Sequence, residues 1–168
     1  MDELSLSVEN NSLLALLGHN GAGKSTTINM LTGHLRPSRG DARIFGRSIK
    51  RNIGSIRGMM GVCPQHVSIS KSSVHTSIQS WSLQDVLWPQ YTGREHLELF
   101  AQLKGAPLNE AKADVAGCIA SVLLQHAADR PVRTYSGGMK RRLSIAVALI
   151  GNPSVAFLDE VSTWVFAH

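Results

Sequence analysis

The sequence predicts an α/β protein with a mainly parallel sheet and an added helical region, and three observations lead to this prediction. A glycine-rich loop, residues 18–25, lies between an apolar run and a helical segment. A glycine pair, residues 137–138, opens another helix, and an apolar segment, residues 154–158, ends in two carboxylates. Strands and helices that alternate in this way are typical of open parallel sheets, which bind ligands at the carboxyl ends of their strands.

The composition is that of one globular domain. The chain has 168 residues, of which 43% are hydrophobic, and this is enough to bury a core. The longest apolar runs, residues 13–17 and 145–150, are far shorter than the ~20 residues that cross a bilayer. The first three residues are Met, Asp and Glu, whereas a secretory signal begins with basic residues. We therefore expect a chain that is made and kept in the cytosol.

Two further features of the composition favour structural roles. Cys63 and Cys118 lack the spacing of metal ligands, so we expect reduced, half-buried thiols. Residues 36–57 carry seven basic side chains and one acid, Asp41, within a chain of net charge +5. This stretch has one aromatic residue, Phe45, for stacking on bases. A solvated rim is therefore favoured over a nucleic-acid surface, and no nucleic-acid partner is expected.

The predicted elements follow from periodicity and from stop signals. Strands are expected over residues 4–8, 12–17, 42–45, 59–63 and 154–158. Helices are expected over residues 25–31, 108–127 and 137–150, with a further helix behind the capping box Thr92-Gly93-Arg94-Glu95. That helix carries an apolar stripe of Leu97, Phe100 and Leu103. Residues 67–84 are rich in serine and show neither the periodicity of a helix nor that of a strand.

The loop Gly18-His19-Asn20-Gly21-Ala22-Gly23-Lys24-Ser25 fits the pattern G-x-x-x-x-G-K-[ST]. Its glycines allow backbone N–H groups to turn inward and surround phosphate oxygens at a helix N-terminus. Lys24 adds a positive charge for the β- and γ-phosphates, and the Ser25 hydroxyl can bind Mg²⁺. No guanine-reading N-K-x-D segment occurs in the chain, so ATP is preferred to GTP.

Two other motifs complete the predicted chemistry. Asp159 and Glu160 follow an apolar strand, where the first could hold Mg²⁺ and the second could deprotonate an attacking water. The alternative is an ordinary acidic pair facing solvent. The catalytic interpretation is favoured because the same chain contains the glycine loop. Ser136-Gly137-Gly138 offers a hydroxyl and N–H groups at a helix start, which is a second anion site. One nucleotide needs one phosphate loop, so this second site suggests a nucleotide held by another chain.

With these motifs in place, the chain resembles the nucleotide-binding domain of ABC transporters of subfamily A, the lipid-exporter-like group. The resemblance rests on GHNGAGKST, on GVCPQH and on YSGGMKRRLSIAVALIGNPSVAFLDE, which look like the Walker A, Q-loop and signature-to-Walker B segments. It implies a P-loop NTPase fold of the RecA-like ABC type with a helical signature subdomain. It also implies ATP and Mg²⁺ as cofactors, and MgATP hydrolysis as the reaction.

The resemblance further implies the site residues, all of them in numbers of this chain. Glu160 and Gln65 would be catalytic, and Mg²⁺ would be bound by Ser25, Gln65 and Asp159. The nucleotide would be bound by Gly18, His19, Asn20, Gly21, Ala22, Gly23, Lys24, Ser25 and Thr26. Ser136, Gly137 and Gly138 would close on the nucleotide of a second, head-to-tail domain. Transmembrane domains would be the other partners, which places the chain at the cytoplasmic face of a membrane.

The chain departs from the family pattern in four places. An adenine-stacking aromatic residue and a strand with a switch histidine are missing, residues 67–84 are an anomalous insert, and residues 161–168 do not continue the family sequence. We therefore expect one incomplete domain, residues 1–168, with a helical and signature region at 85–151 and no C-terminal strands. The insert and the tail both begin with valine, whose codons start with GT, which favours translated introns over a genuine surface insertion and a natural tail.

These departures leave two alternatives to an active exporter ATPase. The chain could be a catalytically impaired fragment that keeps its phosphate loop, since the missing strand would leave its neighbours with unpaired backbone groups. It could also be a soluble ABC ATPase without a transport role, which the basic stretch supports weakly. The segments CPQH and YSGGMKRRLS favour the exporter.

Overall fold

The computed structural model describes residues 4–63 and 87–159. The chain divides into two compact units, Met1–Ile56 and Arg57–His168, and each is described by itself. The insert predicted at residues 67–84 and the tail at residues 161–168 lie outside the described residues.

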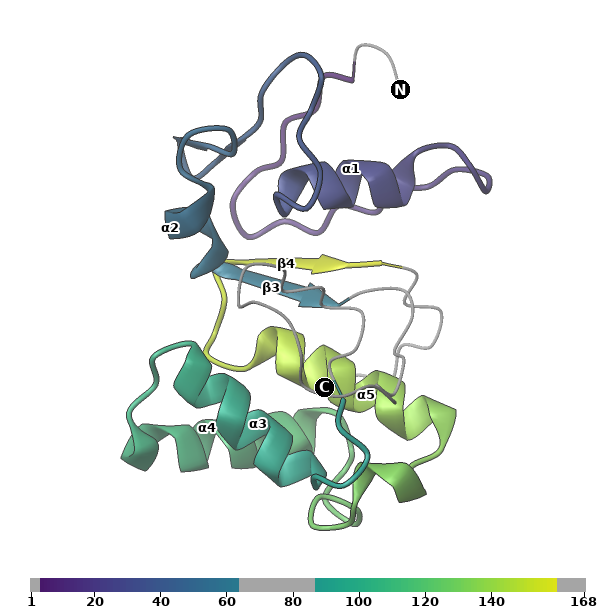
Figure 1. Ribbon diagram of the computed structural model, residues 1–168, viewed down its shortest axis with the longest axis vertical. Coiled ribbons are helices and arrows are strands. Elements are labelled where there is room, and N and C mark those ends of the chain that lie inside the picture. Colours follow the sequence, from purple (N-terminus) through teal and green to yellow (C-terminus); the bar gives the residue numbers. More distant parts are fainter. Residues whose placement is uncertain (1–3, 64–86, 160–168) are drawn as a thin grey trace, which may run out of the picture. The chain divides into compact units, whose positions relative to one another are not determined.

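The first unit contains a helix of two turns, a small hairpin and most of a second, shorter helix. Helix α1, Lys24–Leu31, confirms the helix predicted behind the glycine loop. Strands β1, Arg43–Ile44, and β2, Arg47–Ser48, pair in antiparallel fashion. Helix α2, Ile53–Arg57, follows them (Figure 1). The prediction of a strand at residues 42–45 is thus confirmed in part, whereas β2 was not predicted.

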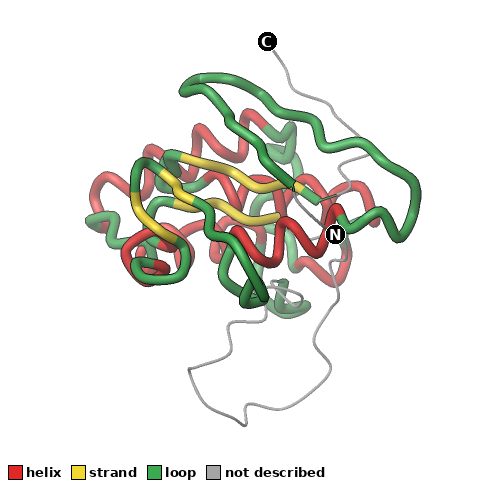
Figure 2. Tube along the Cα trace, turned by 90° about the horizontal axis from the view of Figure 1, so that it is seen from above, coloured by secondary structure: helices red, strands yellow, loops and turns green. Residues whose placement is uncertain are grey.

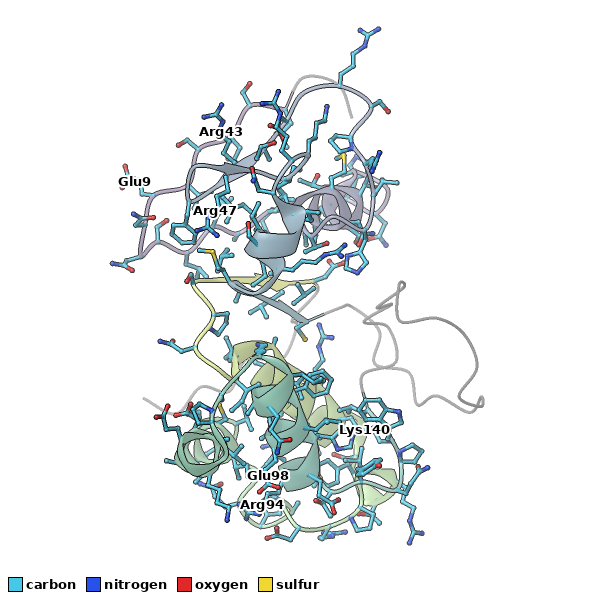
Figure 3. All side chains as sticks on the ribbon, turned by 60° about the vertical axis from the view of Figure 1, so that its left-hand side comes forward. Glu9, Arg43, Arg47, Arg94, Glu98 and Lys140 are labelled. Carbon is cyan, nitrogen blue, oxygen red and sulfur yellow. The ribbon has the colours of Figure 1, made fainter. Side chains whose placement is uncertain are left out.

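The turn between β1 and β2 explains why the predicted strand is shorter than expected. Phe45 and Gly46 both have positive φ, 48° and 75°. Two successive residues of this kind make the tight turn that matches the twist of a hairpin. Arg43 and Arg47 of the hairpin lie on the exposed surface of this unit (Figure 3).

Two predicted strands, at residues 4–8 and 12–17, are wrong for the structure as described. Both segments have no regular secondary structure, and Leu13 and Leu17 are 90% and 89% exposed. A strand exists only where a neighbour accepts and donates its backbone hydrogen bonds. Within the described residues, no strand pairs with either segment.

The second unit packs helices on one side of a parallel strand pair (Figure 1). Its elements are β3, Met60–Cys63, α3, Gly93–Leu103, α4, Leu108–Ser121, the 3₁₀ turn η2, Val132–Thr134, α5, Gly137–Leu149, and β4, Val155–Leu158. The register of β3 and β4 runs from Met60 opposite Val155 to Cys63 opposite Leu158. Both strands therefore end at the same edge, as their arrows in Figure 1 show, and Figure 2 shows the two strands side by side from above.

The main core of this unit lies among α3, α4 and α5. Its fully buried members include Leu87, Leu97, Val115, Leu124, Leu143 and Ile150. A second, smaller cluster joins α5 to the strands through Cys63, Ile145 and Ala148, with Leu149 and Leu158 packed against them. Helix α5 is thus shared by the helical core and the strand pair.

The capping box predicted for α3 is confirmed, and it fixes where that helix begins. The Thr92 side chain accepts a hydrogen bond from the Glu95 N–H at 3.1 Å, and the Glu95 carboxylate accepts one from the Thr92 N–H at 2.7 Å. The predicted stripe is only partly correct, because Leu97 is buried while Leu103 is 53% exposed. Helix α4 ends at Ser121 and not at residue 127, because Leu123 has a φ of 55°, which a right-handed helix cannot contain.

His96 is a buried residue of α3 that the sequence pattern did not single out. Its ring Nδ1 lies 2.7 Å from the Thr92 carbonyl, which can only accept, so Nδ1 carries the proton. Its Nε2 then accepts a hydrogen bond from the Trp88 N–H at 2.8 Å. The ring is 1% exposed and stacks on the Trp88 ring. In its neutral form, His96 therefore holds the segment before α3 in place through these two hydrogen bonds.

This arrangement predicts a pH-dependent stability. Burial lowers the pKa of His96, and the Thr92 carbonyl and the Glu95 carboxylate only partly oppose this. The unfolded chain therefore binds a proton more readily, and the stabilising contribution of neutral His96 is lost as the pH falls from about 6.5 towards the lower folded pKa. Urea unfolding between pH 7.5 and 5 should show a smaller loss of unfolding free energy for His96→Gln than for the wild type. The exposed His126→Gln should keep the wild-type slope, and equal slopes for all three proteins contradict the prediction.

Candidate functional site

The glycine loop of the first unit contains a tight turn with two glycines at positive φ. Gly21 and Gly23 have φ values of 84° and 93°, a region that other residues rarely adopt. The Ala22 N–H donates to the His19 carbonyl at 3.1 Å and closes the turn. The Lys24 ammonium donates to the carbonyls of Gly18, at 2.7 Å, and of His19, at 3.0 Å. The lysine charge is thereby held over the loop.

The start of α1 keeps its backbone donors available. Gly23 is the N-cap and has no side chain to accept from the first turn. The orphan N–H groups of a helix start, with the positive end of its dipole, attract anions. Asn20 and Thr26 are exposed and Ser25 is half-buried. Loop and helix start thus bring the predicted nucleotide-binding residues of this unit together.

A second set of open donors lies at the start of α5 in the other unit. Ser136 is the N-cap, and its hydroxyl accepts a hydrogen bond from the Met139 N–H at 3.3 Å. Gly137 and Gly138 are exposed, and a Cβ at either position would meet no atom within 4 Å. The surface at this helix start is therefore bare enough for a bulky anion to approach the backbone.

The strand pair places the acidic motif beside the predicted Q-loop. Asp159 directly follows β4, and its N–H donates to the Cys63 carbonyl, the last residue of β3, at 3.0 Å. Parallel pairing thus continues one residue beyond the assigned strands. Gln65 and Glu160 lie outside the described residues. The Cys63 thiol beneath this edge is fully buried and not half-buried as expected, and burial raises its pKa.

Arg141 is a residue near this edge that the sequence analysis missed. Its Nη2 donates a hydrogen bond to the main-chain carbonyl of Asp159. The available signal was the basic run Lys140-Arg141-Arg142 directly after the glycine pair. Sequence alone cannot show which member of such a run faces the strands.

The segment before α5 is braced by backbone contacts with the segment before α3. The N–H groups of Val132 and Arg133 donate to the carbonyls of Tyr91 and Pro89, both at 2.9 Å. The buried Tyr135 hydroxyl donates to the Ala127 carbonyl at 2.6 Å. These contacts set the position of Ser136, which is the next residue.

Comparisons with known proteins agree with these features. A family model described as ABC transporter matches residues 1–163. ABC transporter A family member 1 of Dictyostelium discoideum is 45% identical over 162 residues, which are 96% of this chain and 16% of that protein. The phospholipid-transporting ATPase ABCA3 of Mus musculus is 43% identical over 163 residues, 97% of this chain and 8% of that protein. The chain therefore spans less than a fifth of the length of these relatives.

The structural comparison points to the same fold. A solved ATP-binding subunit of an ABC transporter matches with a TM-score of 0.67 and 26% identity, over 86% of this chain and 52% of that one. The cbiO1 protein of Clostridium perfringens, described as part of the transporter complex cbiONQ, matches equally well. The predicted P-loop NTPase fold is thereby confirmed. Over residues 4–63 and 87–159, no helix combines the length and apolar character that crossing a membrane requires.

Proposed function

Since this chain belongs to the ABC transporter family and its relatives are A family members, we propose that it binds and hydrolyses ATP for a membrane exporter of lipids. The observation that carries the reaction is the shared edge of β3 and β4, where Asp159 is hydrogen-bonded to the end of the strand that leads to Gln65. The lipid cargo is supported by one relative, which is named for phospholipid transport.

The phosphate chain of ATP would lie along the loop from Gly18 to Gly23. Backbone N–H groups of the loop and of the first turn of α1 would bind its oxygens, and Lys24 would balance its charge. The hydroxyl of Ser25, the amide oxygen of Gln65 and the carboxylate of Asp159 are hard oxygen donors, which fit Mg²⁺. When bound, Mg²⁺ supplies charge that stabilises the transferred phosphoryl group.

The hydrolytic step needs a water in line with the γ-phosphorus. Glu160 would accept a proton from this water as the water oxygen bonds to the γ-phosphorus. The bond between the γ-phosphorus and the β-phosphate oxygen would break and release ADP. Gln65 would orient the water. Ser136, Gly137 and Gly138 would reach the γ-phosphate of a second, head-to-tail domain, which their bare helix start would allow. Transmembrane domains at the cytoplasmic face of a membrane would be the remaining partners.

One observation favours a second candidate function, ATP binding without turnover. The segment before the glycine loop forms no strand, and Leu13 and Leu17 are almost fully exposed. A loop that no strand anchors can still bind phosphate, but it positions the reacting groups less well, and small misplacements cost much of the rate.

Phosphate release from ATP and Mg²⁺, compared between the wild type and Glu160→Gln, tests the proposal. We expect the wild type to turn over ATP and Glu160→Gln to be slower by roughly 100- to 10,000-fold, the usual range for a lost general base, with ATP binding kept. Equal, background-level release with intact binding favours the second candidate. A wild type that binds no ATP contradicts both.

A further inference from the structure

Helix α5 packs on the strand pair at unusually close range. A Cβ added to Gly61 of β3 would lie 2.1 Å from the Ala148 carbonyl oxygen, so the backbones of strand and helix are in direct contact there. Ile145 and Ala148 of α5 share a buried cluster with Cys63. Helix α5, which begins at the predicted signature, therefore packs directly against β3, the strand that leads to the predicted Q-loop.

Arg141 makes a second link between this helix and the strands, at the ligand edge. It lies one helical turn after Gly137 and is half-buried. Its guanidinium donates to the Asp159 carbonyl, while the Asp159 N–H donates to Cys63. The main chain of Asp159 is thus bound on one side by α5 and on the other by β3. Both backbone dihedrals that aim the Asp159 carboxylate are constrained by these two bonds.

The neighbouring Arg142 has different contacts, which makes it a control. Arg142 donates to the carbonyls of Val122 and Leu123, at 3.3 Å and 3.1 Å, where α4 ends. Lys140 is labelled on α5 in Figure 3 and is half-buried. Arg142 thus joins α5 to the helical core, whereas Arg141 joins it to the strand edge.

We propose that Arg141 is a positioning residue, which aims the Asp159 carboxylate at Mg²⁺ and ties that carboxylate to the signature helix. The proposal rests on the proposed function, in which Asp159 meets MgATP. It predicts that a shift of α5, as when Ser136 engages the nucleotide of a second domain, moves Asp159 as well. Replacing a residue that holds a metal ligand in place without touching the metal commonly changes metal affinity by about 10- to 100-fold.

The test measures ATP binding by calorimetry in EDTA and then as a function of Mg²⁺, in Arg141→Met, Arg141→Lys and Arg142→Met. We expect Arg141→Met to bind ATP in EDTA as the wild type does, but to need about 10- to 100-fold more Mg²⁺ for the Mg²⁺-dependent gain in affinity. Arg141→Lys keeps the charge but loses the planar fork, so we expect a smaller shift in the same direction. Arg142→Met should be less stable to heat and have wild-type Mg²⁺ dependence.

The outcomes separate this proposal from the function on which it rests. If the ATP affinity of the wild type responds to Mg²⁺ and both Arg141 variants show the same Mg²⁺ dependence, the proposed role of Arg141 is overturned and the proposed function is not. Equal shifts in Arg141→Met and Arg142→Met overturn it too, because they indicate a general loosening of α5. If circular dichroism shows that Arg141→Met does not fold, the test rests on Arg141→Lys. An unchanged Mg²⁺ requirement in that variant then overturns the proposal. A wild type that binds no ATP overturns the proposed function and this proposal together.

Discussion

Lys24→Ala is expected to weaken ATP binding by roughly 30- to 1,000-fold, because the truncation of a charge paired with a bound anion costs about 2–4 kcal/mol. The Lys24 ammonium is held by the carbonyls of Gly18 and His19, so its charge lies over the loop that would receive the phosphates. Little side-chain ordering is then needed when a phosphate binds. Titration with a fluorescent ATP analogue measures the effect.

The matched control for Lys24 is Lys50→Ala in the same unit. Lys50 is an exposed lysine close to Asp41, outside the glycine loop, and its removal changes the net charge by the same amount. We expect the ATP affinity of Lys50→Ala to stay within about twofold of the wild type, since Lys50 is exposed and salt screens exposed charges. Equal losses in the two variants would show that net charge, and not the loop, governs binding.

Gly61→Ala is expected to destabilise the second unit by at least about 3 kcal/mol, the upper end of overpacking in a core. The new Cβ would lie 2.1 Å from the Ala148 carbonyl oxygen and 3.0 Å from the Ala148 carbonyl carbon. These are backbone atoms of α5, so a rotamer change cannot relieve the clash and the helix must move away from β3. Chemical denaturation followed by circular dichroism measures the loss.

Gly117→Ala is the control for this substitution. Gly117 lies in α4 of the same unit, and a Cβ there would meet no atom within 4 Å. Alanine is a better helix former than glycine, so we expect a gain of about 0.5–1 kcal/mol. If Gly61→Ala is as stable as the wild type, then α5 does not pack on β3 as the structure describes.

Local chemistry explains the elements that were predictable. The capping box at Thr92 and the N-cap Ser136 satisfy helix-start N–H groups with side chains a few residues away, so α3 and α5 begin where the sequence predicts. The glycine loop is equally local, because Gly21 and Gly23 adopt backbone angles that the other residues avoid. The chain order of these motifs also predicted the fold class, and their resemblance to known motifs predicted the family.

The elements that depend on a distant partner were decided by tertiary structure. Residues 12–17 are as apolar as β4, yet only β4 has a neighbour, β3, to complete its hydrogen bonds, so only β4 is a strand. His96 is buried and contacts the rings of Trp88 and Tyr91, which the sequence around it does not reveal. Arg141 reaches Asp159, 18 residues further along, while the adjacent Arg142 reaches the end of α4. Short-range rules determined where helices and the phosphate loop begin, whereas strand pairing and side-chain partners required contacts that only the folded chain brings together.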